Sequence, residues 1–288
     1  METVEKAYAK LNLSLDVIKK LPSGYHEIDF VMQEIKLYDV IKLKKVDKGI
    51  RLISSIGICP TKENLAYKAA EVIIKKFKLK KGVEITIEKN IPIGAGLGGG
   101  SSDAAALIKG MKKLFNIKMS EEEMVETAAM IGMDVPFFIL GGTVHATGRG
   151  EKIKGIEPLP KDVYFVLAKP NFNISTRDAY NNLDYEKISK ERKTAQMLKA
   201  IKEQNIEKIA ENMHNDFECS ICKKYPIISE IKEKMIKNKA LNALMSGSGP
   251  TVFGITREEA VAENIQDSLK KDPYFKKNLN FVCITQTR

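Results

Sequence analysis

A glycine-rich loop between two regular segments constrains the fold of this chain more than any other feature. Five of the seven residues in Gly94–Gly100 are glycine. The segment before the loop, Val83–Lys89, alternates apolar and polar residues and predicts a half-buried strand. The segment after it opens with Ser101–Asp103, residue types that favour helix starts, and continues with helical apolar spacing. The sequence therefore predicts a strand, a glycine loop and a helix in direct succession.

This succession favours phosphate binding. Without Cβ atoms, the loop lets backbone N–H groups turn toward an anion, and the helix start adds unpaired N–H groups and a positive dipole end. Other phosphate loops fit less well: a Walker A loop needs Gly-Lys-Ser/Thr, and a protein-kinase loop joins two strands. Gly94, Gly96 and Gly99 have the glycine spacing of a Rossmann fingerprint. It would need a strand after the helix, where a second helical segment begins near Ser120.

The composition is that of an ordinary globular protein. The 288 residues are 43% hydrophobic and 29% charged, and no apolar run approaches the ~20 residues of a membrane helix. The first residues lack the layout of a secretory signal, so we expect a cytoplasmic protein without a membrane partner. Cys59, Cys219, Cys222 and Cys283 are too few for a disulfide framework. Because the one CxxC has no second pair, we expect free, partly buried thiols rather than a zinc site.

The formal net charge of +10 leaves two classes of anionic partner open. A basic nucleic-acid-binding protein is one alternative, and a protein that attracts small anionic substrates is the other. The lysines are spread along the whole chain with only local clusters, such as Lys75–Lys81, and the chain has no Trp. We therefore expect no nucleic-acid partner, and keep that class as the alternative.

Turn signals and apolar periodicity outline the first half of the chain. Extended segments are separated by signals such as Pro22–Gly24, and a helix follows at Glu63–Phe77. After the glycine loop and its helix, a second helix begins with the capping box Ser120–Glu123 and ends near Gly132. A hairpin starts within Gly141–Gly150. The extended segments expected before the first helix are Thr3–Lys10, Leu13–Ile18, Ile28–Leu37 and Val40–Leu43.

A proline-rich turn at Pro158–Lys161 separates the two halves, so we expect domains at 1–160 and 161–288. Strands and helices follow one another in irregular order, not as a regular βαβ series, so the predicted fold class is α+β. The elements expected in the second half are a strand Val163–Lys169, several helices within Ser175–Lys237, a glycine turn, a strand Thr251–Thr256, a helix and a strand Asn280–Thr285.

The glycine loop resembles that of the GHMP kinase superfamily, which includes galactokinase, homoserine kinase and mevalonate kinase. Members carry a Pro-x-x-x-Gly-Leu-Gly/Ser-Ser-Ser type of loop, which Pro92–Ser102 matches, and a second glycine turn, which Ser246–Thr251 matches. The resemblance implies transfer of a phosphoryl group from ATP to an alcohol. It also implies a two-domain GHMP kinase fold. The N-terminal domain, with the ATP loop and the catalytic residues, would be like domain 2 of ribosomal protein S5, and the C-terminal domain would be ferredoxin-like.

Three further motifs are similar to one branch of the superfamily. They are Ala9–Asn12, Gly24–His26 and Gly132–Phe137, in the order and spacing of that branch. The branch phosphorylates the 2-hydroxyl of a methylerythritol that carries a cytidine diphosphate group, in the non-mevalonate pathway to isoprenoid precursors. The resemblance thus implies a small-molecule substrate with a cytidine diphosphate group. Another GHMP kinase, such as homoserine kinase, stays an alternative, although Gly24–His26 argues against it.

The resemblance assigns catalysis to Asp134 and Lys10. Asp134 would orient the acceptor hydroxyl and accept its proton, and Lys10 would stabilise the charge on the γ-phosphate. A carboxylate beside an ammonium stays ionised and is a weak base, which the loose transition state of phosphoryl transfer tolerates. Without the resemblance, Asp134 at the end of a helix would be a turn or capping residue, and Lys10 would be one solvated lysine among many.

The resemblance also implies binding of ATP and Mg²⁺ at the glycine loop, with no protein ligand of the metal assigned. Ser101 and Ser102 could donate to phosphate or reach the metal, or one of them could simply cap the helix. Asn64 and Lys89 match family positions beside the adenine and ribose. The loop residues expected to contact ATP are Pro92, Ile93, Gly94, Ala95, Gly96, Leu97, Gly98, Gly99, Gly100, Ser101 and Ser102.

The cytidine group would be bound by residues from both halves of the chain. Tyr25 offers a face for stacking and His26 an edge for hydrogen bonds, although packing in a core is the commoner fate of a Tyr. His145 and His214 match no functional position. The residues expected to contact substrate are Asn12, Tyr25, His26, Asp134, Thr176, Tyr180 and Gly247. We expect a monomer or a homodimer.

Overall fold

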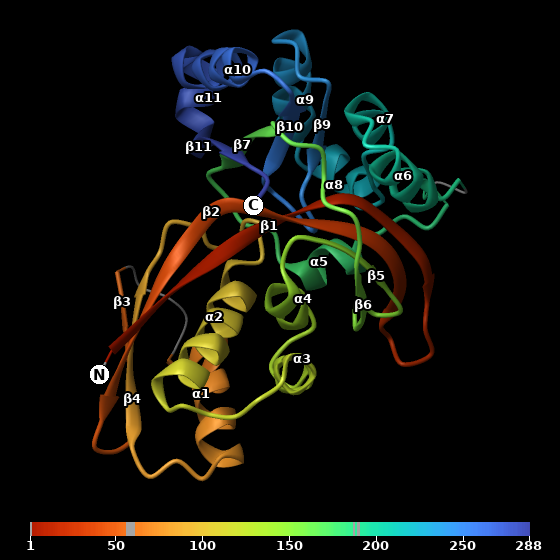
Figure 1. Cartoon of the computed structure of the whole chain (residues 1–288). Coiled ribbons are helices and arrows are strands. Elements are labelled where there is room, and N and C mark those ends of the chain that lie inside the picture. The colour runs from red at the N-terminus through yellow and green to blue at the C-terminus, as the bar shows by residue number, and fades with distance from the viewer. Residues whose placement is uncertain (1, 56–60, 187, 189–190) are drawn as a thin grey trace. The chain divides into compact units, whose positions relative to one another are not determined.

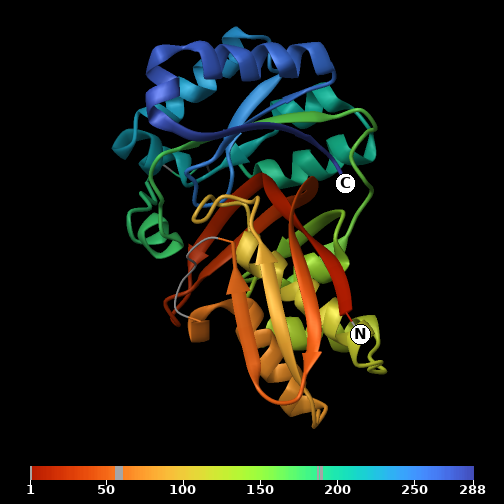
Figure 2. The same ribbon diagram turned by 90° about the vertical axis from the view of Figure 1, so that its left-hand side faces the viewer.

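The structure is a computed structural model that describes residues 2–55, 61–186, 188 and 191–288. Cys59 lies outside these residues. The chain forms two compact units that interleave along the sequence (Figures 1 and 2). Unit 1 comprises Met1–Ala9, Leu37–Ile91 and Gly98–Gly141, and unit 2 comprises Lys10–Lys36, Pro92–Leu97 and Gly142–Arg288. These units differ from the predicted domains at 1–160 and 161–288, which were meant as the two domains of the resembled family. The boundary between those domains stays a prediction.

Two long strands replace the four short extended segments expected near the N-terminus. They are β1 (Glu2–Lys20) and β2 (His26–Val46), and each contributes residues to both units. Asn12 does not end β1, because its side chain is buried and accepts a hydrogen bond from Lys10. Asp39 does not end β2, because its buried carboxylate accepts hydrogen bonds from the N–H groups of Asn90 and Ile91. The expected breaks were wrong because tertiary partners satisfy both polar side chains.

Unit 1 places four helices beside a mixed sheet. Strand β4 (Gly82–Glu88) pairs antiparallel with β2 and parallel with β3 (Ile50–Ser54), and β1 lies on the other side of β2. The helices lie together in Figure 1, where α1 packs on α2, α2 on α4, and α3 on α4. They are α1 (Leu65–Lys76), α2 (Gly99–Leu114), α3 (Glu121–Ala129) and α4 (Val135–Leu140), and a short 3₁₀ helix, η1 (Thr61–Glu63), precedes α1.

Local capping explains where two of these helices begin. Asn64 precedes α1, and its Oδ1 accepts hydrogen bonds from the N–H groups of Ala66 and Tyr67 at 2.8 and 3.4 Å. Ser120 precedes α3, and both hydrogen bonds of its capping box with Glu123 are present. The expected helices at Glu63–Phe77 and from Ser120 are therefore confirmed, and the second one ends at Ala129, earlier than expected.

Unit 2 contains an antiparallel sheet in the order β11–β7–β10–β9. Helices α9 and α10 both pack on β7 and β10. The strands are β7 (Tyr164–Pro170), β9 (Asn242–Met245), β10 (Val252–Thr256) and β11 (Leu279–Gln286). The helices are α5 (Thr176–Asn181), α6 (Lys193–Lys202), α7 (Ile206–Glu211), α8 (Glu218–Lys224), α9 (Ile227–Lys237), α10 (Glu259–Lys271) and α11 (Pro273–Asn278).

Three short strands of unit 2 pair with one another or with the long N-terminal strands. The hairpin of β5 (Thr143–Thr147) and β6 (Lys152–Gly155) is confirmed, and β5 pairs antiparallel with β2. Strand β8 (His214–Asn215) pairs parallel with β1 over two residues. The α+β mixture is also confirmed. Within the described ranges, no helix is both long and apolar enough to span a membrane.

Candidate phosphoryl-transfer site

The glycine loop leads into α2 without a side-chain cap. Gly94, Gly96 and Gly98 all have positive φ, at 62°, 75° and 71°, a backbone region that glycine enters without the Cβ penalty. Gly98 is the N-cap residue, and it offers no side-chain hydrogen bond to the N–H groups of the first turn. Neither Ser101 nor Ser102 caps the helix, because α2 already begins at Gly99. The first turn thus keeps its N–H groups open to an anion.

The first half of the loop, Pro92–Leu97, packs against the glycine turn Ser246–Thr251 within unit 2. A Cβ atom on Gly96 would lie 2.3 Å from the carbonyl oxygen of Ser246, so no other residue fits there without a shift. The hydroxyl of Ser246 donates to the carbonyl oxygen of Gly96 at 3.1 Å. The two glycine-rich segments matched to the family therefore meet through their backbones.

Lys10 and Asn12 lie beside the same glycine turn. Both side chains are buried on β1, and Lys10 Nζ donates to Asn12 Oδ1 at 2.5 Å. A Cβ atom on Gly247 would lie 3.2 Å from both of these polar atoms. The alternative that Lys10 is one solvated lysine among many is therefore wrong. In unit 2 the structure brings together three of the predicted residues, Lys10, Asn12 and Gly247.

Asp134 belongs to unit 1 and directly precedes α4. The expected place at the end of a helix was wrong, because α3 already ends at Ala129 and a turn separates it from Asp134. Its side chain makes no capping hydrogen bond to α4, and Asp134 is half-buried. The carboxylate therefore does not cap a helix, which is one of the two structural roles that the sequence left open.

Lys89 is the centre of a buried charge cluster in unit 1. Its Nζ bonds to a carboxylate oxygen of Asp39 and lies 2.8 Å from Oδ2 of Asp103, in the first turns of α2. Burial raises the pKa of Asp103 to about 7, against the opposing charge of Lys89. Oδ1 of Asp103 is buried without a hydrogen-bond partner among the residues described. Lys89 thus ties the end of β4 to the start of α2, and its predicted contact with ATP stays a prediction.

Two of the predicted cytidine residues, His26 and Tyr180, belong to an aromatic cluster in unit 2. The ring of His26 stacks on Tyr180 with a centroid distance of 4.4 Å and an interplanar angle of 16°, and Tyr180 meets Phe217 edge-on at 4.8 Å. Nε2 of His26 also bonds to the hydroxyl of Tyr185. Burial, helped by the charge of Lys20, lowers the pKa of His26, which favours the neutral imidazole at neutral pH.

Two further substrate candidates, Tyr25 and Thr176, have other partners in unit 2. The Tyr25 residue is 55% exposed, and the Arg149 guanidinium lies 5.3 Å from its ring centroid. The Thr176 hydroxyl lies 3.2 Å from that of Ser248, so the start of α5 contacts the glycine turn. Tyr25 is therefore not a core residue.

Comparisons with known proteins place the chain in a family. The model of the GHMP kinases N-terminal domain matches residues 64–142, and that of the GHMP kinases C-terminal domain matches residues 197–274. The chain belongs to the GHMP kinase family. The 4-diphosphocytidyl-2-C-methyl-D-erythritol kinase of Clostridium botulinum (strain Kyoto / Type A2) is 45% identical over 93% of this chain and 96% of the relative.

A second relative of this GHMP kinase and a solved structure similar to it carry similar names. The 4-diphosphocytidyl-2-C-methyl-D-erythritol kinase of Clostridium novyi (strain NT) is 42% identical over 98% of this chain and 99% of the relative. A crystal structure of 4-(cytidine 5'-diphospho)-2C-methyl-D-erythritol kinase matches with a TM-score of 0.82 and 28% identity, covering 100% of both chains. The predicted family and two-domain GHMP kinase fold are confirmed.

Several contacts of this GHMP kinase were not foreseen from its sequence. Tyr185 bonds to His26, Phe217 supports Tyr180, and Asp39 and Asp103 hold Lys89. Asp103 carried a signal, since it follows the loop directly, but it was interpreted only as helix-start chemistry. The other partners are distant in sequence and have no motif of their own.

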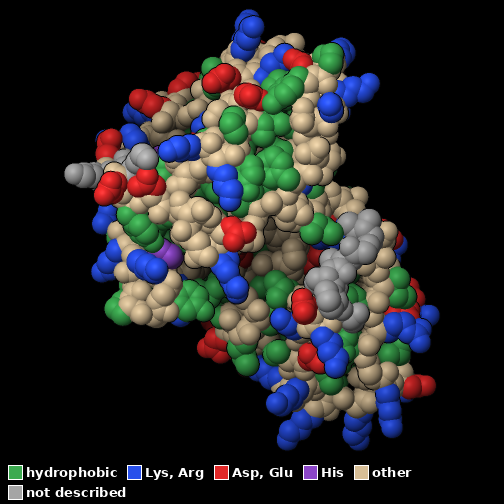
Figure 3. All heavy atoms as spheres, turned by 180° about the vertical axis from the view of Figure 1, so that it is seen from behind, with side chains coloured by type: hydrophobic (Ala, Val, Ile, Leu, Met, Phe, Trp, Pro, Cys, Tyr) green, Lys and Arg blue, Asp and Glu red, His purple; other side chains and the backbone are tan. Residues whose placement is uncertain are grey.

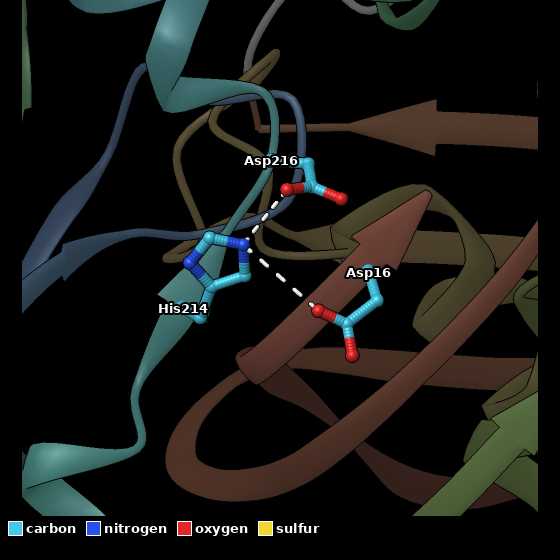
Figure 4. Close-up of side chains that lie close together, drawn as sticks. All are labelled: Asp16, His214 and Asp216. Atoms are coloured by element: carbon cyan, nitrogen blue, oxygen red, sulfur yellow. Dashed lines mark hydrogen bonds and ion pairs between the residues drawn. The ribbon is translucent and has the colours of Figure 1, made fainter. Parts of the chain in front are cut away.

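His214, which matched no function, lies in a second charge cluster, in unit 2. Its Nε2 lies 2.8 Å from Oδ1 of Asp216 and 3.9 Å from Oδ1 of Asp16 (Figure 4). Burial alone would lower the pKa of His214, but the hydrogen bond to Asp216 and the charges of both aspartates raise it. His145 pairs with Asp29 at 2.7 Å. Both histidines therefore have structural partners in the fold.

The remaining sequence-based expectations concern thiols and surface charge. Cys219 and Cys222 are free and half-buried, as expected, and Cys283 is also free and half-buried. On the face shown in Figure 3, blue basic and red acidic side chains are interspersed over much of the surface, and further basic ones project along its lower edge. This agrees with lysines spread along the sequence, and the expected lack of a nucleic-acid partner stays a prediction.

Proposed function

We propose that this GHMP kinase transfers the γ-phosphoryl group of ATP to the 2-hydroxyl of 4-diphosphocytidyl-2-C-methyl-D-erythritol. The observation that carries the proposal is identity of 42–45% with two relatives of that name over at least 93% of this chain. The similarly named crystal structure, which covers the whole chain, supports it. Homoserine kinase, the alternative within the family, is not favoured by these relatives. The cytoplasm remains our predicted location.

ATP would be bound through the glycine loop and the start of α2. The uncapped first turn and the positive φ of Gly98 support this role, since they leave backbone N–H groups for phosphate oxygens. The hydroxyl oxygens of Ser101 and Ser102 are of the kind that Mg²⁺ prefers, so these residues fit a metal bound with ATP. Mg²⁺ would supply charge neutralisation on the polyphosphate.

Lys10 and Asp134 would serve the chemical step. Lys10 is buried and its Nζ is oriented by Asn12, which suits a group that stabilises charge on the transferred phosphoryl group. Asp134 makes no cap, so its carboxylate can accept the proton of the acceptor hydroxyl. Such a weak base suffices where the transition state is loose.

The cytosine base would be recognised around Tyr25, His26 and Tyr180. The 4.4 Å stack of His26 on Tyr180 leaves no room for a base between them, since two van der Waals contacts need about 7 Å. The exposed ring of Tyr25 is therefore the surface offered to a base. A neutral His26 would read the base edge through hydrogen bonds, and a mismatched edge would leave a buried group unpaired.

The test is a steady-state assay of four acceptors: the cytidine substrate, its uridine analogue, methylerythritol phosphate and homoserine. We expect the cytidine substrate to exceed the uridine analogue at least about ten-fold in kcat/KM. Asp134→Asn should lower kcat at least about 100-fold, while calorimetric titration with an ATP analogue stays unchanged. Equal turnover of all four acceptors, or phosphorylation of homoserine alone, would contradict the proposal.

A further inference from the structure

The segment His214–Glu218, which joins β8 to α8, contacts several separate parts of unit 2. His214 lies 3.9 Å from Asp16 of β1 (Figure 4). Oδ2 of Asp216 accepts a hydrogen bond from the N–H group of Val17, also in β1, at 2.6 Å. Oε1 of Glu218 accepts one from the N–H group of Met245 at 2.7 Å. The segment is therefore fixed at both of its ends, to β1 and to β9.

Asn215, inside this segment, is bonded to the glycine turn. It is only 2% exposed, and its Nδ2 donates to the carbonyl oxygens of Met245 at 2.7 Å and Gly247 at 2.8 Å. Its Oδ1 accepts a hydrogen bond from the N–H group of Phe217 at 3.0 Å. One amide group thus binds the two carbonyls on either side of Ser246. A carboxylate at this position would offer no donor to either of them.

The bond to the carbonyl oxygen of Gly247 fixes the orientation of the next peptide group. In a trans peptide the C=O and N–H groups point in opposite directions, so the N–H group of Ser248 points away from Asn215. Among the described residues, no backbone carbonyl oxygen accepts a hydrogen bond from this N–H group. Its neighbour Gly247 is the residue whose Cβ would touch Lys10 and Asn12 at 3.2 Å.

The turn needs such an anchor because its own backbone is permissive. Gly247 and Gly249 both have positive φ, at 57° and 81°, and glycine loses more conformational freedom on ordering than other residues. Inside the turn, the N–H group of Gly249 donates to the carbonyl oxygen of Ser246 at 2.9 Å, and that of Ser246 to the carbonyl oxygen of Thr251 at 2.8 Å. Neither of these bonds orients the peptide between Gly247 and Ser248.

We propose that Asn215 is a positioning residue for phosphoryl transfer. It holds the glycine turn so that Gly247 lies against Lys10 and Asn12, with the N–H group of Ser248 turned outward as a donor for a phosphate oxygen. This role rests on the proposed function, because Lys10 acts on phosphate only if the chain is a kinase of this kind. Asn215 itself does not touch the reacting atoms.

The experiment compares Asn215→Asp with wild type in the phosphorylation of the cytidine substrate. The variant keeps the size of the side chain and replaces its two donors by an acceptor that faces two carbonyl oxygens. We expect kcat to fall about 10- to 100-fold, since a small misplacement of reacting groups costs up to 10² in rate. KM for the cytidine substrate should change less than about three-fold, because the reacting groups and not the base are misplaced.

A pH series separates positioning from a general loss of structure. The carboxyl group that Asn215→Asp introduces, buried against two carbonyl oxygens, should protonate readily and then donate one hydrogen bond. The ratio of kcat for Asn215→Asp to kcat for wild type should therefore rise as the pH falls from about 8 to about 6. A ratio that is flat with pH, or that falls, would overturn the proposal.

Asn242→Asp is the matched control, because Asn242 stands at the other end of β9 and its Nδ2 donates to the carbonyl oxygen of Ala210. We expect its kcat to stay within about two-fold of wild type, since it lies away from the glycine turn. Equal losses of kcat in the two variants would overturn the proposal. If Asn215→Asp fails to fold, Asn215→Ser, which keeps one donor, should show a smaller loss of kcat and the same contrast with Asn242→Asp.

Hydrogen exchange tests the anchor without any substrate. The amides of Ser246 and Gly249 should exchange at least about ten-fold faster in Asn215→Asp than in wild type, whereas amides of β4 should not change. Unchanged exchange at Ser246 and Gly249 would overturn the proposal even if kcat falls. If the wild-type protein does not phosphorylate the cytidine substrate, the proposed function fails, and the exchange result still decides whether Asn215 anchors the turn.

Discussion

Each unit contains a buried cluster in which one cationic side chain meets two aspartates. In unit 1 the cation is Lys89, with a side chain 4% exposed, between Asp39 and Asp103. In unit 2 the cation is His214, with a side chain 25% exposed, between Asp16 and Asp216. Both clusters join segments that are distant in sequence. They differ in the chemistry of the cation and in how far water reaches it.

The two cations respond to pH in different ranges. The charges of Asp103 and Asp39 outweigh the effect of burial and raise the pKa of Lys89 above its ordinary 10.5, so it stays charged at any physiological pH. The pKa of His214 is raised above 6.5, so its charge is lost only as the pH rises beyond that value. The titrating member of the Lys89 cluster is instead Asp103, with a pKa of about 7.

Two clusters with the same number of charged groups therefore respond differently to mutation and to pH. In the Lys89 cluster a permanent cation is sealed from water, so the removal of the cation leaves carboxylates that water cannot reach. In the His214 cluster the cation itself can lose its proton, and hydrogen bonds from backbone N–H groups still hold both aspartates. The first cluster should therefore be intolerant of the loss of its cation, and the effect of losing the cation of the second should depend mainly on pH.

Lys89→Met should have the largest effect on stability. It leaves Asp39 and Asp103 buried without their cation, and a broken buried pair costs about 3–5 kcal/mol. Urea unfolding near neutral pH, followed by circular dichroism, measures the loss in the free energy of unfolding. A loss below about 1 kcal/mol would mean that water or a rearrangement of the protein compensates the lost charge of Lys89. The Lys89 cluster would then be no less tolerant of mutation than the His214 cluster.

His214→Gln should cost less and should depend on pH. Because the folded pKa of His214 is raised, its contribution to stability is complete below pH 6.5 and is lost as the pH rises through the folded value. We expect a loss of about 1 kcal/mol at about pH 6 and a smaller one at about pH 9, since glutamine keeps a donor but not the charge. Melting temperatures of both proteins across this range test the expectation. A difference that grows toward alkaline pH would contradict the assigned charge.

Asp103→Asn should have the smallest effect. With a folded pKa of about 7 against an ordinary 3.8, Asp103 binds a proton more tightly in the folded state, so its contribution to stability falls as the pH rises from 3.8 to about 7. Asparagine carries no charge, so the substitution removes an attraction to Lys89 only at pH values at which Asp103 is ionised. We expect a change below about 1 kcal/mol at about pH 8 and a flatter melting-temperature profile below pH 7. A profile that matches wild type would show that Asp103 does not titrate there.

Sequence reasoning succeeded where structure is specified locally. The helix after Asn64 and the capping box at Ser120 were foreseen because their caps lie within three residues of the N–H groups they satisfy. The glycine loop was foreseen because five glycines in seven positions have few other uses. Three of these glycines, Gly94, Gly96 and Gly98, have positive φ.

It failed where distant residues decide the outcome. The expected breaks at 11–12 and 38–39 do not occur, because the partners of Asn12 and Asp39 let β1 and β2 continue. Strand β9 is only four residues long and β8 only two, so both are too short to show the alternation of apolar and polar residues that predicts a strand. In the candidate site, the motif predicted Lys10 and Gly247 but not Asn215, whose bond to Gly247 joins residues 32 positions apart.

The interleaving of the two units has a consequence for the order in which they can fold during synthesis. All segments of unit 1 lie before residue 142, so its sheet and helices can assemble while the ribosome is still adding the rest of the chain. Unit 2 begins with residues 10–36, which must wait for partners made much later. Glu34, for example, accepts hydrogen bonds from the backbone and side chain of Arg288, 254 positions downstream. Residues 10–36 of the β1–β2 hairpin are thus translated early but meet their unit 2 partners late. Between these two events they would need protection from aggregation.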